Sequence, residues 1–219
     1  MTYSGAYIGG GKGWRLAPGH FAERHALIVI IALGESIVAL GLGASHELDA
    51  GVIAAAMLGL AIAAALWWLY FDVVAIVAER KLRDATGNAQ LTMARDSYSY
   101  LHLPLVAGII LFAVGAKKTL GDVGEPLKLV PAGALCGGVA LYLVAHVLFR
   151  LRNVRTFNRH RTVVSVLLLA LIPVALELPA LATLAAVAGL CVGLIAYEAI
   201  RFAEARDRVR NAPPREAAA

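Results

Sequence analysis

The sequence predicts an all-α protein, a polytopic transmembrane bundle of about six helices. Of its 219 residues, 60% are hydrophobic and only 16% are charged, and the mean hydropathy is +0.73. The apolar residues fall into stretches close to the ~20 residues that a helix needs to cross ~30 Å of hydrocarbon. Most basic residues lie between these stretches. Such a composition is typical of a membrane protein and not of a soluble domain.

The first apolar stretch, residues 26–44, holds a single acid, Glu35, at its centre. A carboxylate at mid-bilayer is costly and usually faces protein or water. Two interpretations stay open: a protonated carboxyl that is hydrogen-bonded to a neighbouring helix, or a group that binds or relays an ion or proton. One helical face carries His20, Arg24, Ile31 and Glu35, and we expect this stripe to face the interior of the bundle.

The second span is expected at residues 50–77, where it forms an antiparallel hairpin with the first because only a short turn separates them. The aromatic cluster WWLYF, residues 67–71, indicates a membrane interface at the far end of this span. Asp72 follows at the membrane end that also holds Arg24. These two side chains either form an ion pair or both reach out to water.

Four further spans are expected at residues 98–116, 130–149, 162–176 and 180–200. His102 lies in the first turns of the third span. His146 and Arg150 lie four residues apart on one face at the end of the fourth span. His146 is interpreted either as a hydrogen-bonded packing residue or as a functional group.

The chain divides into three parts on this reading of the apolar stretches. We expect a flexible glycine-rich leader at residues 1–19, a six-helix transmembrane domain at residues 20–201 and a charged cytoplasmic tail at residues 202–219.

Charge orients the six spans. Of the 20 Lys and Arg residues, only Lys117, Lys118 and Lys128 fall on one side of the predicted bundle, which leaves 17 on the other. Basic loops are retained in the cytoplasm, so we expect a multi-pass protein of the inner (plasma) membrane with both termini cytoplasmic. The same residues explain the isoelectric point of about 9.4, and no nucleic acid partner is expected.

No motif in the sequence assigns a reaction. There is no HExxH zinc motif, and no Ser-His-Asp or paired-carboxylate arrangement stands out by position. Cys136 and Cys191 lie within apolar stretches, where free thiols behave as small hydrophobic residues. We therefore expect no enzymatic activity, no metal and no cofactor.

Four short motifs resemble the bacterial low temperature requirement A family: HFAER at residues 20–24, LGES at residues 33–36, FD at residues 71–72, and the His146 and Arg150 pair. The resemblance implies a multi-pass membrane protein of a family named for a cold-growth phenotype. The chain is similar to the C-terminal portion of longer members, and the resemblance implies no particular substrate or reaction.

Two functions remain open. The first is a transporter or channel-like protein for a proton, an ion or a small solute, with Glu35 as its central group. The pathway would then be lined by His20, Arg24, Asp72, His102, His146 and Arg150. The second is a non-transporting membrane component that supports cold adaptation through lipid or protein partners. Both functions place the chain in a lipid bilayer, and the sequence leaves the oligomeric state open.

Overall fold

The computed structural model describes residues 16–44 and 49–211. Most of the predicted leader, residues 45–48 of the predicted first turn and the last eight residues of the predicted tail, 212–219, lie outside this part of the chain. The first described helix, α2 (Pro18–Gly43), already begins within the range predicted as leader. Proline suits the first turn of a helix, where its missing N–H is not needed.

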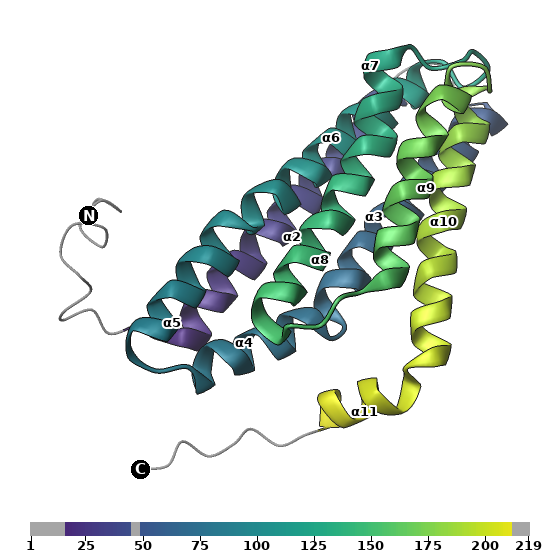
Figure 1. Cartoon of the computed structure of the whole chain (residues 1–219). Helices are drawn as coiled ribbons and strands as arrows, with labels where there is room; N and C mark the ends of the chain where they lie inside the picture. The colour runs from purple at the N-terminus through teal and green to yellow at the C-terminus, as the bar shows by residue number, and fades with distance from the viewer. Residues whose placement is uncertain (1–15, 45–48, 212–219) are drawn as a thin grey trace.

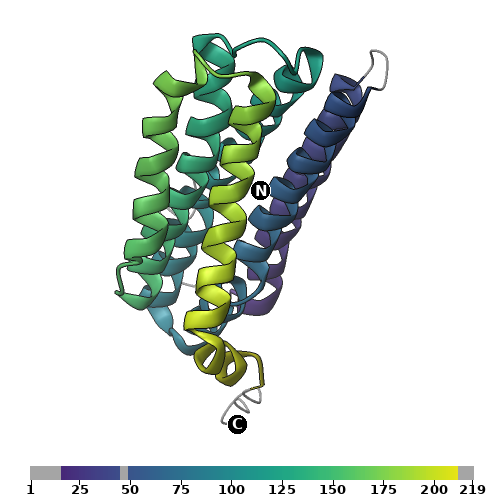
Figure 2. The same cartoon turned by 90° about the vertical axis from the view of Figure 1, so that its right-hand side faces the viewer.

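The described residues form an elongated bundle of six long helices with shorter helices at both ends, as Figures 1 and 2 show. The long helices are α2, α3 (Ala50–Phe71), α6 (His102–Gly121), α8 (Gly138–Val154), α9 (Arg159–Ala175) and α10 (Ala180–Arg201). No strand occurs within the described ranges beyond an isolated bridge between Pro126 and Pro179. The predicted all-α bundle is confirmed.

Shorter elements join and extend these helices. They are α4 (Val74–Asp84), α5 (Gly87–Met93), η1 (Ala94–Tyr100), α7 (Leu129–Ala132), η2 (Gly133–Gly137) and α11 (Ala203–Asn211). The elements η1 and η2 are π-helical: η2 continues directly into α8, and Leu101 alone separates η1 from α6. A π-helical turn is rare and often lies at a functional site.

Five helical segments are long and apolar enough to cross a membrane. They cover Pro18–Gly43, Ala50–Asp84, Gly87–Gly121, Leu129–Val154 and Ala180–Arg201. The remaining predicted span corresponds to α9, which packs against α8 and α10. Its 17 residues give a length of about 26 Å at ~1.5 Å per residue, slightly less than the hydrocarbon thickness of ~30 Å.

The second span does not run unbroken to residue 77, as the sequence predicted. Helix α3 ends at Phe71, and Val73 leaves the helical backbone with φ −136° and ψ −36° before α4 begins. The new direction carries α4 across the ends of α2 and α8 (Figure 1). This corner leaves Asp72 at the end of α3, facing a region that α11 also reaches.

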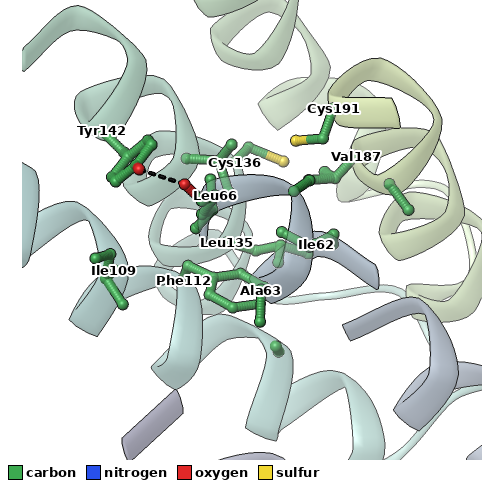
Figure 3. Close-up of a cluster of buried hydrophobic side chains, with 14 of the residues drawn as sticks. Ile62, Ala63, Leu66, Ile109, Phe112, Leu135, Cys136, Tyr142, Val187 and Cys191 are labelled. Atoms are coloured by element: carbon green, nitrogen blue, oxygen red, sulfur yellow. Dashed lines mark hydrogen bonds between the residues drawn. The ribbon is translucent and has the colours of Figure 1, made fainter. Parts of the chain in front are cut away.

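The core of the bundle is apolar and lies mainly between α3, α6, α8 and α10, as Figure 3 shows. Ile62, Leu66, Phe112 and Leu135 are fully buried there, and the Tyr142 hydroxyl donates to the Leu66 carbonyl at 2.5 Å. Burial of this kind excludes both lipid and water from the centre of the bundle.

Helices α6 and α8 are in direct backbone contact. A Cβ atom added to Gly138 would lie 2.6 Å from the Phe112 nitrogen and 2.8 Å from the Gly108 carbonyl oxygen. Small residues allow this close approach, which is a common way for helices to associate in membranes. The glycines therefore fix how α8 sits against α6.

Candidate functional site

A cavity of about 260 Å³ lies at the end of the bundle where α3 meets α4 and where α11 folds back. Its walls come from α3, α4, α8, α9, α10 and α11, and most of them are apolar. The charged side chains that line it are Asp72, Arg150, Arg161, Glu198 and Arg206. We call this space the charged cavity. It lies at the end of the bundle that carries most of the basic residues.

An ion pair between Arg161 and Glu198 forms one wall of the charged cavity. The Arg161 guanidinium donates from Nε to Glu198 Oε1 at 3.0 Å and from Nη2 to Oε2 at 2.8 Å. Only 8% of the Arg161 side chain and 17% of the Glu198 side chain are exposed. Asn158 caps α9 and donates to the same carboxylate at 3.1 Å. The pair joins α9 to α10 in the two-point geometry that gives arginine–carboxylate pairs their specificity.

The third nitrogen of Arg161 reaches a buried histidine. Arg161 Nη1 lies 2.8 Å from His146 Nδ1 and 3.4 Å from the Leu69 carbonyl oxygen. Because a guanidinium can only donate, Nδ1 of His146 accepts and the ring proton lies on Nε2. His146 Nε2 is buried, and it has no hydrogen-bond partner among the described residues. A buried donor that is left unsatisfied costs about 1–3 kcal/mol.

A second buried histidine lies nearby. The Tyr70 hydroxyl lies 2.8 Å from His102 Nε2, and His102 Nδ1 lies 3.1 Å from the Ser97 carbonyl oxygen. The carbonyl can only accept, so Nδ1 carries the proton and Tyr70 donates to Nε2. The Tyr70 ring also contacts the His146 ring, with centroids 5.8 Å apart. The two predicted histidines thus belong to one polar cluster behind the charged cavity.

The polar cluster also contacts the wall of the charged cavity, at Asn153. The Ser97 hydroxyl, which lies in η1, donates to Asn153 Oδ1 at 2.6 Å. Asn153 is only 7% exposed and lines the cavity, and its Nδ2 has no hydrogen-bond partner among the described residues. Asn153 therefore lines the cavity and carries a buried N–H donor without a partner in the described part of the chain.

Asp72 does not pair with Arg24, so the first of the two alternatives, the ion pair, is wrong; of the two side chains only that of Arg24 is exposed, while Asp72 is largely buried. Arg206 in α11 donates to the Asp72 carboxylate from Nε at 2.6 Å and from Nη2 at 2.9 Å, and Arg210 approaches it at 3.5 Å. The hydrogen bonds to Asp72 raise the pKa of Arg206 above its usual range, so this guanidinium stays charged. Arg206 also lies 5.5 Å above the Trp68 ring. These contacts hold α11 across the end of the bundle, where it closes one side of the charged cavity.

The predicted stripe of α2 faces away from the bundle, not into its interior. His20, Arg24, Ile31 and Glu35 do share one face of α2, but all four are exposed. The opposite face, with Val29, Leu33, Ser36 and Leu40, packs against the bundle. From residue 26 onwards α2 is apolar on nearly every side, so apolar periodicity could not show which face is inward. His20 lies 3.8 Å from the exposed Glu23, and Glu35 lines neither the charged cavity nor the core.

Of the seven predicted site residues, four lie in or beside the charged cavity. Asp72 and Arg150 line it, while His102 and His146 lie in the polar cluster behind it. Arg150 donates to the Thr156 hydroxyl at 2.9 Å and forms no ion pair within the described part of the chain. His20, Arg24 and Glu35 lie apart from this group on the exposed face of α2.

Sequence reasoning missed Arg161, Glu198 and Arg206. Glu198 is an acid within the last apolar stretch, and Arg161 directly precedes the fifth. The sequence places Glu198 at the membrane interface near the end of the last span, but no spacing predicts that it meets Arg161. In the described part of the chain, no group of three His, Cys, Asp or Glu residues is arranged to hold a metal ion.

The fold and the site together define a class: an integral membrane protein whose helical bundle carries a charged cavity at one end. The model of the family described as bacterial low temperature requirement A protein matches residues 4–196, and the chain belongs to this family.

One curated relative is an uncharacterized protein of Rhizobium meliloti (strain 1021), 37% identical over 125 residues. The match covers 57% of this chain and 30% of the relative, so the chain matches less than a third of that protein's length. No solved structure matches the chain.

Proposed function

We propose that the protein moves a proton, an ion or a small solute across the membrane, and that the charged cavity is its binding site at the basic end of the bundle. The observation that carries the proposal is the buried Arg161–Glu198 pair at the cavity wall. Buried ion pairs are often no more stabilising than apolar residues of the same size. Ionisable groups among membrane helices more often belong to pathways for ions or substrates.

The polar cluster extends the site towards the middle of the bundle. His146 accepts from Arg161, and Tyr70 connects the rings of His146 and His102. Both histidines are neutral in this arrangement and can exchange a proton at Nε2 or Nδ1. For a proton or a weak acid, this cluster supplies exchangeable groups directly behind the charged cavity. The proposal includes no chemical conversion of the solute.

The opposite half of the bundle is closed by the apolar core between α3, α6, α8 and α10. Transport therefore requires a second conformation in which this core opens. The π-helical element η2 lies at that end, next to the close contact between α6 and α8. A π-helical segment is a point where a helix can change its local register, so we assign η2 to this movement.

We assign the basic end to the cytoplasm of the inner (plasma) membrane, because the excess of Lys and Arg there follows the positive-inside rule. The charged cavity would then open to the cytoplasm. Glu35 has no part in this cavity. Its predicted role as a central group would require another helix or water to cover the exposed face of α2.

The second candidate is a membrane component that does not transport. The closed apolar core favours it, because the described polar side chains form no continuous path between the two ends. In that case the charged cavity would serve lipid or protein contacts that support growth in the cold.

Reconstitution tests the proposal directly. The purified protein is placed in vesicles, and proton, alkali-cation and small-anion fluxes are compared with those of protein-free vesicles under an imposed gradient. We expect a flux above the protein-free background for at least one class of solute. If folded, monodisperse protein gave only the background flux for every class of solute, the non-transporting candidate would be favoured.

A further inference from the structure

We propose that the charged cavity binds a phosphate group, with the apolar part of the phosphate-bearing molecule lying along the cavity's apolar walls. The inference rests on the proposed function only in treating the cavity as a binding site. It names the ligand class and holds whether or not that ligand crosses the membrane.

The charges around the cavity favour an anion. Three arginines and two acids line it, and each acid is already held by an arginine: Glu198 by Arg161 and Asp72 by Arg206. Arg150 is the remaining positive charge, and a single hydroxyl contact to its Nε leaves its two terminal nitrogens available. Planar guanidinium groups are well suited to phosphate oxygens.

A second donor lies on the same helix and in the same cavity. Asn153 is three residues after Arg150 in α8, which places the two side chains as neighbours on one helical face. Its Nδ2 is buried and lacks a partner within the described residues, because Oδ1 is used by Ser97. An anion that accepts from Nδ2 would remove the cost of an unsatisfied donor. We thus assign to one ligand the charge of Arg150 and a neutral N–H group of Asn153, whose side chain turns Nδ2 towards the ligand on binding.

The remaining walls indicate that the ligand has an apolar part. Trp68, Val77, Phe149 and Phe202 line the same space. The cavity lies at the helix ends beside the aromatic cluster, the depth at which lipid headgroups meet the hydrocarbon. Basic pockets between helices on the cytoplasmic side are a recurring site for anionic headgroups. A fully hydrated inorganic anion would gain little from these apolar walls.

Binding is tested on the purified full chain in a neutral detergent, by native mass spectrometry and by titration with thermal unfolding as readout. The probes are phosphatidylglycerol, phosphatidylcholine as a zwitterionic lipid, glycerol 3-phosphate and inorganic phosphate. We expect phosphatidylglycerol to bind at least about tenfold more tightly than phosphatidylcholine, the scale of one charge-assisted hydrogen bond. Saturation by glycerol 3-phosphate or inorganic phosphate at similar concentrations would overturn the proposal, because neither probe has an apolar part to lie along the cavity walls.

Variants locate the binding in the charged cavity. Arg150→Gln should weaken binding about tenfold, whereas Arg150→Lys should retain part of it because the charge remains. Arg159→Gln is the matched control, because it removes an exposed arginine at the same end of the bundle. Equal effects of Arg150→Gln and Arg159→Gln, or equal binding of both lipids, would overturn the proposal. None of these readouts uses flux, so a protein that binds without transporting is distinguished from one that does neither.

Discussion

Asp72 and Arg206 lie 134 positions apart in the chain and are joined by two hydrogen bonds, at 2.6 and 2.9 Å. Their contact connects the corner after α3 to the helix that follows the last span. Because both side chains are largely buried, the pair is protected from the screening that weakens exposed ion pairs. It holds α11 in place as one wall of the charged cavity.

Asp72→Asn should release α11. The substitution removes the charge that Arg206 and Arg210 share, and a hydrogen bond to a charged group contributes about 1.5–3 kcal/mol. We expect trypsin to cleave after Arg206 and Arg210 roughly tenfold faster than in the unaltered protein. Asp84→Asn is the control, since Asp84 is an exposed acid at the same end. Equal cleavage rates for the two variants would show that Asp72 does not hold α11.

The close contact of α6 and α8 gives a second prediction. Gly138→Ala should lower the free energy of unfolding by about 1–3 kcal/mol, because the new methyl group would collide with the α6 backbone. Gly137→Ala is the matched control, since a Cβ at the adjacent glycine meets nothing within 4 Å. Thermal unfolding in detergent measures both. If Gly138→Ala proved as stable as Gly137→Ala, the close packing of α8 against α6 would be contradicted.

The fold could be predicted largely from the sequence because a bilayer restricts a chain to few solutions. Apolar stretches of sufficient length become helices, and the breaks at Ser45–Asp49 and at Pro179 separate them. Local geometry was harder to predict. The corner at Asp72 is not marked by proline or glycine, and the short helix α9 reaches its position by packing against α8 and α10.

The charged cavity could be predicted only in part. Asp72, His102, His146 and Arg150 were identified because each is polar at the edge of an apolar stretch. Their partners were not, because pairing across the bundle depends on how the helices rotate. The same ambiguity led to the wrong orientation of Glu35, because the apolar residues around it cover nearly every side of α2.

Glu35 gives a third prediction. The described residues offer it no hydrogen bond or ion pair, and its side chain is exposed. Glu35→Gln should therefore change the free energy of unfolding of the isolated chain by no more than about 0.5 kcal/mol. Chemical or thermal unfolding of the purified protein measures this change. A destabilisation of several kcal/mol would mean that another segment or a second copy covers this face of α2.

Topology gives a fourth prediction. A reporter fused after Ala219 should lie in the cytoplasm, and one inserted at Asp122 should lie outside, because the basic residues concentrate at the end that holds α4, α5 and α11. Paired reporters that are active in opposite compartments measure both positions. An external signal from the fusion after Ala219 would reverse the assignment of the charged cavity to the cytoplasm.

The central claim is that the Arg161–Glu198 pair serves transport and is not only structural. The most direct test is the flux of Glu198→Gln protein in vesicles, at a temperature where it is fully folded, against Glu204→Gln, whose acid is 93% exposed. Glutamine keeps the shape of Glu198 but cannot balance the charge of Arg161. We expect Glu198→Gln to lose at least about 90% of the flux, a tenfold effect or ~1.4 kcal/mol, while Glu204→Gln retains it. Equal flux from the two folded variants would contradict the central claim.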